Sequence, residues 1–212
     1  MKIIDTSSNT TDQVSCIASE GVQTIFRYYT STANWKVITL SEAEAISNAG
    51  MQIGVVFEDG NDLDFFTEQI GYNNAVSAYT YATQTIDQPC GSAIYFAIDL
   101  NVTDAQIQSN IIPYFKGIQN GFKKLSTDKQ NYKVGAYGCG AAINELLIEG
   151  LCEFRWLSES SSYNGTEEAL TNNNYELAQQ YKADLEICTI VIDQDNPREG
   201  VTDFGGFTLK DD

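Results

Sequence analysis

The sequence predicts a single (β/α)8 barrel, and three features support that prediction. The chain has 212 residues, close to the lower end of the roughly 200 to 400 residues that such barrels contain. Short apolar runs alternate with helical segments, which is typical of βα units around a parallel sheet. Eight such runs are present, and eight is the number of strands that closes this barrel. We therefore expect one domain over residues 1–212.

The eight apolar runs are interpreted as strands. The run from Ser92 to Asp99 gives the clearest signal, because it is apolar on both faces and ends in a carboxylate, like a strand covered on both sides. A doubly wound open sheet shows the same alternation and remains an alternative. No G-x-G-x-x-G or Walker motif is present, so we expect no nucleotide cofactor. The predicted strands lie at residues 2–5, 24–29, 52–58, 92–100, 133–138, 153–159, 176–181 and 188–194.

Capping signals mark two of the intervening helices. Ser41 with Glu44 predicts a capping box, and Gly50 predicts the end of that helix. Thr103 with Gln106 predicts a second capping box, which opens a helix running towards residue 125.

Two further segments complete the expected organisation. Residues 71–85 predict a helix from alanines at helical spacing, and Pro89 and Gly91 break the chain after it. The segment 158–174 is rich in Ser and Asn, so we interpret it as a long loop at the mouth of the barrel.

The composition excludes several classes of function. Twelve Lys and Arg residues stand against 29 Asp and Glu, which leaves a formal net charge of −17. Such a charge repels nucleic acids and anionic membrane surfaces, although the acidity also fits a protein that only needs to stay soluble. The chain has no His, so Ser-His-Asp and Cys-His catalysis and most zinc and non-haem iron sites are excluded. Any acid–base chemistry must rest on carboxylates, Tyr, Cys or Lys.

The five cysteines are too sparse for a disulfide scaffold, and we expect most of them to be small buried apolar side chains. The odd number leaves at least one free thiol in the monomer that we expect. No C-x-x-C pair occurs among them, so redox centres and metal knuckles are unsupported. They stand at Cys16, Cys90, Cys139, Cys152 and Cys188.

The sequence also bears on location. The N-terminal residues become polar too soon for a secretory signal, and no apolar run is long enough to span a bilayer, so we expect no membrane insertion. Three locations stay open: the cytosol, a bacterial extracellular or cell-wall position reached without a removable signal, and export of a chain that has already been processed.

Polar and aromatic side chains gather at the ends of the predicted strands. Function in barrels of this kind lies at the C-terminal strand ends. Carboxylates with amides and flat aromatic rings between them suit a sugar, because rings cover its C–H faces while polar groups bind its hydroxyls. We therefore expect a carbohydrate site. The candidate residues are Asp5, Arg27, Glu58, Asp99, Asn101, Tyr137, Trp156, Glu159, Gln179, Asp193 and Asp195.

Glycoside cleavage commonly requires one protonated and one ionised carboxyl group. Asp99 is the leading candidate for the acid, because the end of a buried strand and like-charged neighbours raise a carboxyl pKa. Asp5 and Asp193 would then be ionised partners, and Arg27 would hold one of them ionised or bind a substrate carboxylate.

Structural roles compete with each of these assignments. An Asp at a strand end often caps the following helix, and Asp195 beside Asn196 also fits a turn. Arg27 fits a structural ion pair, and Tyr137 and Trp156 fit core packing. Clustered carboxylates also bind Mg²⁺ or Ca²⁺, so metal dependence is left open, although we assign no metal site.

The order of several short motifs resembles a known family. The chain is similar throughout to the glycoside-hydrolase-like barrel family described as domain of unknown function 1906, which is itself similar to the family 25 lysozymes that act on peptidoglycan. The motifs are Asp5-Thr6-Ser7, Ile25-Phe26-Arg27-Tyr28-Tyr29, Leu40-Ser41-Glu42-Ala43-Glu44, Ile94-Tyr95-Phe96-Ala97-Ile98-Asp99, Val134-Gly135-Ala136-Tyr137-Gly138 and Trp156.

The resemblance implies a barrel, a polysaccharide partner such as peptidoglycan, and an acidic site that contains Asp5, Asp99 and Asp193. One departure concerns the fourth strand, which ends Asp-x-Glu in family 25 lysozymes, with Glu as the proposed acid. Here the corresponding residues are interpreted as Asp99-Leu100-Asn101, and neutral Asn101 cannot donate a proton as a carboxylic acid does. Asp99, Glu58 or Glu159 then replaces it, or hydrolysis is lost.

Three functions are compatible with these residues. The first is a glycoside hydrolase that acts on peptidoglycan or a related polysaccharide by carboxylate acid–base chemistry. The alternative is a non-catalytic carbohydrate-binding or effector protein on a degenerate lysozyme-like barrel, and a different barrel hydrolase or lyase is a third possibility.

Overall fold

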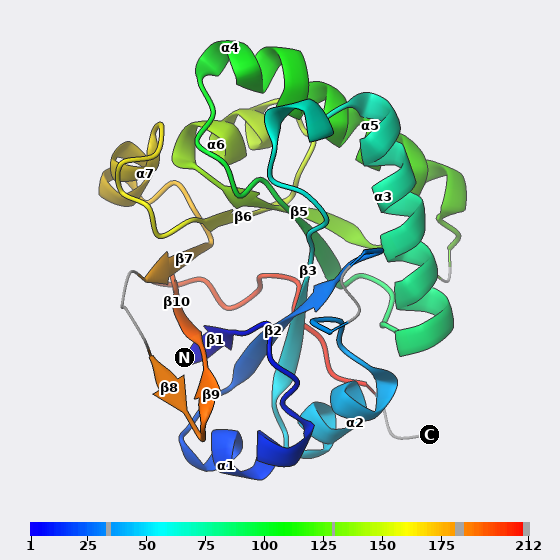
Figure 1. Ribbon diagram of the computed structural model, residues 1–212, viewed down its shortest axis with the longest axis vertical. Helices are drawn as coiled ribbons and strands as arrows, with labels where there is room; N and C mark the ends of the chain where they lie inside the picture. Colours follow the sequence, from blue (N-terminus) through cyan, green and yellow to red (C-terminus); the bar gives the residue numbers. More distant parts are fainter. Residues whose placement is uncertain (33–34, 129, 181–184, 210–212) are drawn as a thin grey trace.

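The computed structural model describes residues 1–32, 35–128, 130–180 and 185–209. Eight strands form a closed barrel, surrounded by helices, so the predicted (β/α)8 class is confirmed (Figure 1). The barrel strands are β1 (Ile3–Asp5), β2 (Thr24–Tyr29), β3 (Gln52–Phe57), β4 (Ala93–Ala97), β5 (Lys133–Gly138), β6 (Phe154–Leu157), β7 (Leu177–Gln180) and β10 (Asp193–Pro197). Their order around the barrel is β1-β10-β7-β6-β5-β4-β3-β2.

The last strand differs from the prediction in position and direction. β10 is antiparallel to both β1 and β7, whereas the other neighbours in the barrel are parallel. Most of the predicted run 188–194 belongs instead to a hairpin of β8 (Glu186–Ile187) and β9 (Ile190–Val191). Cys188 and Thr189 turn this hairpin with positive φ angles of 54° and 67°. The first residue of β10 therefore lies at the mouth, and residue 181 of the predicted seventh strand lies outside the described residues.

Alternate residues of each strand fill the barrel interior, as the pleat requires. Aromatic rings dominate this layer, and Phe26 lies with its ring centroid 4.6 Å from that of Trp156. Two strand glycines make room for the rings: a Cβ at Gly54 would lie 2.5 Å from Phe26, and one at Gly135 would lie 2.4 Å from Tyr95. The outward residues of the strands form a second, larger apolar layer against the helices.

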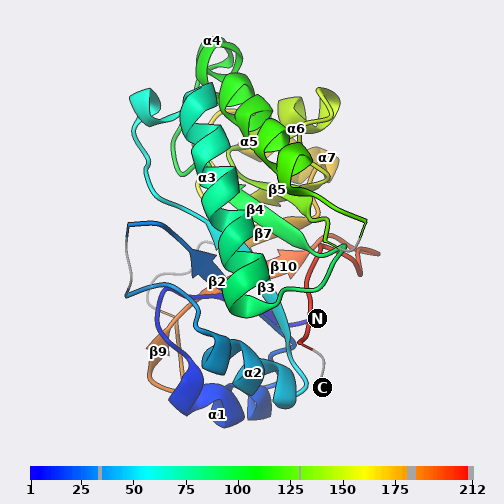
Figure 2. The same cartoon turned by 90° about the vertical axis from the view of Figure 1, so that its right-hand side faces the viewer.

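The helices surround the barrel, and α3 and α5 lie side by side along one flank of it (Figure 2). Thr103 and Gln106 form the predicted capping box. The other predicted box is wrong, because Thr39 caps that helix by accepting a hydrogen bond from the backbone N–H of Glu42. The helices are α1 (Val14–Ser19), α2 (Leu40–Asn48), α3 (Glu68–Tyr81), η3 (Ala82–Ile86), α4 (Asp104–Gln106), η4 (Ile107–Ile111), α5 (Ile112–Leu125), α6 (Gly140–Ile148) and α7 (Thr166–Asn172), with short turns at η1 (Thr11–Gln13) and η2 (Leu63–Phe65).

The helix at α7 corrects the interpretation of 158–174 as loop throughout. The helix predicted over 71–85 begins earlier, at Glu68, because Thr67 caps it by accepting a hydrogen bond from the N–H of Ile70. None of the helices within the described residues is long and apolar enough to cross a membrane.

The cysteines correct another expectation. Cys16 and Cys188 form a disulfide that joins α1 to the β8–β9 hairpin. Cys139 and Cys152 are buried free thiols, as predicted, whereas Cys90 is exposed. Most of the five are therefore not buried free thiols.

The C-terminal segment covers the end of the barrel opposite the mouth. The Tyr95 hydroxyl donates to the carbonyl of Phe204 over 2.8 Å, which places the Phe204 ring inside the barrel. The N–H of Ala93 donates to Gly205, and Phe207 forms a bridge with Ile53. Because Ala93 and Ile53 stand near the starts of their strands, the interior is covered at this end.

Candidate functional site

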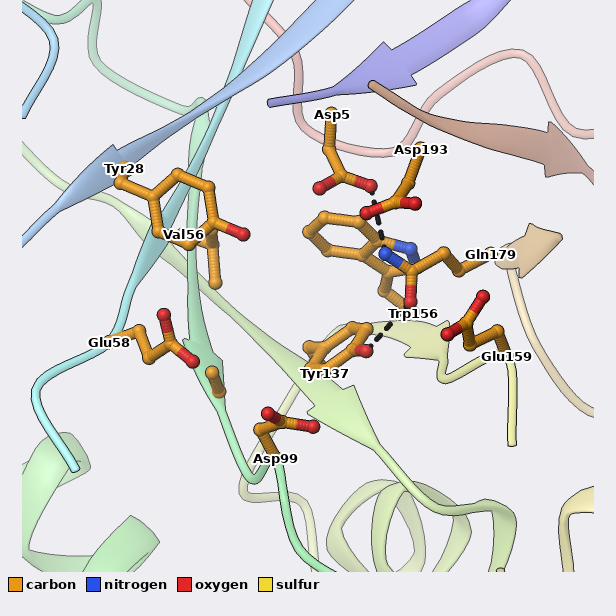
Figure 3. Close-up of a pocket in the computed structure, with 11 residues that line it drawn as sticks. Asp5, Tyr28, Val56, Glu58, Asp99, Tyr137, Trp156, Glu159, Gln179 and Asp193 are labelled. Carbon is orange, nitrogen blue, oxygen red and sulfur yellow. Dashed lines mark hydrogen bonds between the residues drawn. The ribbon is translucent and has the colours of Figure 1, made fainter. Parts of the chain in front are cut away.

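A cavity of about 220 Å³ lies at the C-terminal ends of the parallel strands. Figure 3 shows side chains from several strands projecting into this single space. Eight of the eleven candidate residues from the sequence line it, and three do not. The lining residues are Asp5, Tyr28, Val56, Glu58, Ala97, Asp99, Tyr137, Trp156, Glu159, Gln179 and Asp193.

Asp5 is the buried carboxyl group of the cavity, with 2% of its surface exposed. The Gln179 amide donates to Asp5 Oδ2 over 3.0 Å, and the Tyr137 hydroxyl donates to the amide oxygen of Gln179 over 2.7 Å (Figure 3). This chain of hydrogen bonds sets which way the Gln179 amide faces, because its oxygen must accept and its nitrogen must donate. Asp5 is thus held in a fixed orientation at the cavity wall.

The pKa of Asp5 is raised from 3.8 to about 7. Burial is the main cause, and the negative charge of Asp193 is the second. The two carboxyl groups face each other because Asp5 ends β1 and Asp193 begins β10, in direct register. Hydrogen bonds from Gln179 and Asp195 oppose the rise. Asp5 therefore exchanges its proton near neutral pH.

Asp195 lies one layer below the cavity and is completely buried. The indole N–H of Trp156 donates to its Oδ1 over 2.7 Å, and its Oδ2 accepts no hydrogen bond within the described part of the chain. Burial and the neighbouring Asp5 raise its pKa well above the ordinary value. The protonated form of Asp195 is therefore favoured. It does not line the cavity, so its predicted contact with substrate is corrected to this supporting position.

Three more carboxyl groups stand around the rim. Asp99 is exposed, which corrects the expectation that burial at the end of its strand would shield it. Partial loss of water and the nearby Glu58 still raise the pKa of Asp99, against the effect of Lys36. Burial, followed by Asp193 and Asp99, also raises the pKa of Glu159.

Two polar residues of the site were missed in the sequence. Lys36 forms an ion pair with Glu58 at 2.6 Å, and its ammonium lies 4.8 Å from the ring centroid of Tyr28. Tyr28 itself lines the cavity beside Val56. Tyr28 lies on the same face of β2 as the inward-pointing Phe26, and Arg27 lies on the other face. Both faces of this strand are buried, so its sequence carries no signal that tells them apart.

Arg27 faces the opposite side of β2 and is completely buried. Its guanidinium donates to Glu42 at 2.8 and 3.3 Å and to the carbonyl of Thr6. Arg27 therefore contacts neither a cavity carboxylate nor a substrate, and the structural ion pair that competed with that prediction is the role the geometry shows.

Asn101 also lies outside the cavity, where its side-chain oxygen accepts from the backbone N–H of Asn164 over 2.9 Å. The two cavity-lining positions at the end of the fourth strand are Ala97 and Asp99. An Asp-x-Glu pair that faced this cavity would therefore occupy residues 97 and 99. Those two positions hold Ala97 and Asp99, so the end of the fourth strand presents one carboxyl group to the cavity, and the predicted contact of Asn101 with substrate is not supported.

The aromatic residues have two roles at once. Trp156 is only 2% exposed and packs in the barrel interior, yet its edge reaches the cavity. The ring centroid of Tyr137 lies 4.8 Å from that of Trp156. Within the described residues, no group of three or more His, Cys, Asp or Glu is arranged to hold a metal ion.

Comparison with known proteins places this geometry in a family. Residues 15–198 match the model of the Rv2525c-like, glycoside hydrolase-like domain. Two uncharacterized Bacillus subtilis (strain 168) proteins are similar in sequence: YbfG is 26% identical over 186 residues and FadG is 30% identical over 136. These matches cover 83% and 60% of this chain but 25% and 22% of the relatives, so the chain spans about a quarter of their length.

Solved structures share the fold. The Mycobacterium tuberculosis Tat-secreted protein Rv2525c, in complex with L-tartrate, is 20% identical with a TM-score of 0.78, covering 97% of this chain and 98% of that one. The Streptococcus pneumoniae autolysin LytC, in complex with a synthetic peptidoglycan ligand, is 14% identical with a TM-score of 0.59. The match covers 92% of this chain and 46% of that one. A muramidase from Acremonium alcalophilum is 13% identical with a TM-score of 0.55, and the match covers 93% of this chain and 92% of that one. On the match of its residues 15–198, the chain belongs to the Rv2525c-like, glycoside hydrolase-like domain family.

Proposed function

We propose that the chain is a glycoside hydrolase that cleaves peptidoglycan or a related polysaccharide by carboxylate acid–base chemistry. The observation that supports this most is the convergence of five carboxyl groups and three aromatic side chains on one cavity at the strand ends. The autolysin and muramidase that share the fold support the choice of a cell-wall glycan.

The arrangement of the carboxyl groups suits cleavage of a bond held between them. In Figure 3, Glu58 and Asp99 lie on one side of the cavity, and Asp5 and Asp193 lie on the other. Two carboxyl groups on opposite sides of the scissile bond are the common requirement of this chemistry. Gln179 fixes Asp5 by its hydrogen bond, so that its side of the cavity is ordered before the glycan binds.

Asp99 donates the proton in this proposal. Its raised pKa keeps a larger share of its carboxyl groups protonated in weak acid, and its exposure allows a new proton to arrive from solvent after each turnover. Asp193, and Asp5 when it is ionised, place negative charge beside the sugar ring and stabilise the positive charge that develops on it. The glycosidic oxygen leaves with the proton from Asp99, and water supplies the new hydroxyl group.

The test is the release of reducing sugar from purified peptidoglycan between pH 4 and 7. Wild-type protein should release fragments and Asp99→Asn should not, while Asp12→Asn, an exposed carboxylate in η1, serves as the matched control. If the wild type releases nothing across this range although it is folded, the hydrolase proposal is wrong.

One observation favours the non-catalytic alternative. The fourth strand presents Ala97 and the short Asp99 at the two cavity positions where an Asp-x-Glu pair would stand. A site that lacks one carboxylate and has a shorter acid still binds sugars through its remaining polar and aromatic groups. Sedimentation with insoluble peptidoglycan, without release of fragments, would support this second function.

A further inference from the structure

A second aromatic feature stands outside the cavity. Trp35 is 70% exposed, and no other aromatic side chain within the described residues is classed as exposed. Burying a Trp side chain is strongly favourable, so a folded protein gains nothing in stability from leaving this one in water. The exposed indole is free to stack against a ligand.

Trp35 belongs to the connection between β2 and α2. The next residue, Lys36, reaches two walls of the cavity: its ammonium pairs with Glu58 at 2.6 Å and lies over the ring of Tyr28. The N–H of Ile38 then donates to the carbonyl of Tyr28 over 3.1 Å. Trp35 is thus one residue from a side chain that contacts two residues of the cavity lining.

The other side of this connection is also tied to the rim. Asp59, which directly follows the cavity residue Glu58, accepts hydrogen bonds from the hydroxyl groups of Thr30 and Ser31 and, over 2.9 Å, from the backbone N–H of Ser31. Residues 30 and 31 are therefore held beside the end of β3.

We propose that Trp35 is a stacking platform for a sugar unit of the glycan adjacent to the unit held in the cavity. The inference rests on the proposed substrate class, although it does not require hydrolysis. The flat indole face covers the apolar C–H face of a sugar ring, as Tyr and Trp do at other interfaces where one side of a group is apolar and the other is wet. Because the cavity itself is lined by carboxylates, such a platform adds affinity for a glycan without adding charge.

The proposal predicts dependence on the length of the glycan. A disaccharide that occupies the cavity alone should bind wild-type protein and Trp35→Ala equally. Tetra- and hexasaccharides of peptidoglycan should bind wild-type protein more tightly than the disaccharide does. Their affinity for Trp35→Ala should be about tenfold lower than for wild type, the size expected for one aromatic contact. Trp35→Tyr should restore part of it. The measurements use calorimetry in the Asp99→Asn background, so that the ligand is not consumed.

Fluorescence locates the contact. The chain has two Trp residues, and the other, Trp156, is buried, so the exposed emission comes from Trp35. A blue shift with hexasaccharide that is absent with disaccharide, and absent in Trp35→Phe, supports the proposal. Ile148→Ala removes another exposed apolar side chain, 77% exposed at the end of α6, and is the matched control.

The outcomes separate this proposal from the proposed function. If Trp35→Ala and Ile148→Ala bind every fragment as tightly as wild type does, the platform is wrong while a carbohydrate site stands. If wild-type protein binds no fragment of any length and releases no sugar, the proposed function fails and the platform fails with it. Because Trp35 is exposed, unchanged circular dichroism and melting temperature are expected in each Trp35 variant.

Discussion

Asp5→Asn should make the protein more stable at neutral and alkaline pH. Asp5 is buried against Asp193 and above Asp195, so ionising it places a charge where water does not reach. Asn has nearly the same shape and carries no charge, and its amide can still accept a hydrogen bond from Gln179. The substitution therefore removes the cost of the charge and keeps the packing.

The pKa gives the size and the pH range of the effect. Folding raises the pKa of Asp5 from 3.8 to about 7, and this difference corresponds to about 4 kcal/mol when the group is ionised in both states. For a carboxyl with a raised pKa, stability is complete below the unfolded value. It falls as the pH rises from about 4 to about 7 and is then constant. Because Asp195 is coupled to Asp5, the titration belongs to the pair.

Urea unfolding followed by circular dichroism at several pH values from 4 to 8 measures the effect. The free energy of unfolding of Asp5→Asn should exceed that of wild type by several kcal/mol at pH 8, and the difference should shrink to nothing near pH 4. Asp12→Asn, at an exposed position, should follow the wild-type curve. A gap between Asp5→Asn and wild type that stays constant with pH would refute the reasoning, since a constant gap reflects packing and not charge.

Three other predictions concern the fold and the site. Glu42→Ala leaves the buried Arg27 guanidinium without its partner and should lower the free energy of unfolding by about 3–5 kcal/mol, whereas Glu44→Ala, exposed on the same helix, should change it little in urea titrations. Replacing Cys16 and Cys188 together by Ser should cost about 2–5 kcal/mol, seen as a lower melting temperature, and Cys90→Ser should leave that temperature unchanged. Gln179→Leu removes a hydrogen bond that lowers the pKa of Asp5, so carboxyl NMR should report a higher pKa there; an equal or lower value would contradict the assigned contact.

The sequence located the barrel strands other than the last, because strands at the centre of a barrel are short apolar runs that end in polar residues. It did not determine which face of each strand points inward. β2 is buried on both faces, since one faces the barrel interior and the other faces helices, so alternation of buried and exposed residues is absent. That is why Arg27 was chosen in place of Tyr28. Asn101 stands beyond the end of β4, and its place outside the cavity depends on the path of the loop that follows the strand.

The last strand was unpredictable for a different reason. Cys188 and Thr189 turn the chain in the left-handed region, which residues other than Gly, Asn and Asp seldom adopt, so the local sequence gives no turn signal. The disulfide joins residues 172 positions apart, and only the assembled fold brings them together. The exposed Trp35 carried no sequence pattern, since exposure depends on what surrounds a side chain.

The pairing of β1 with β10 also governs the order in which the molecule can assemble. β1 has no partner on one side until synthesis has passed Asp193, where that partner begins. Contacts between such distant segments are slow to form. Asp193 arrives with that final strand, so incompletely synthesised chains hold Asp5 without the burial and the neighbouring negative charge that raise its pKa. The acidic centre therefore comes into being only at the moment the ring of strands closes, and partly folded chains should be without it.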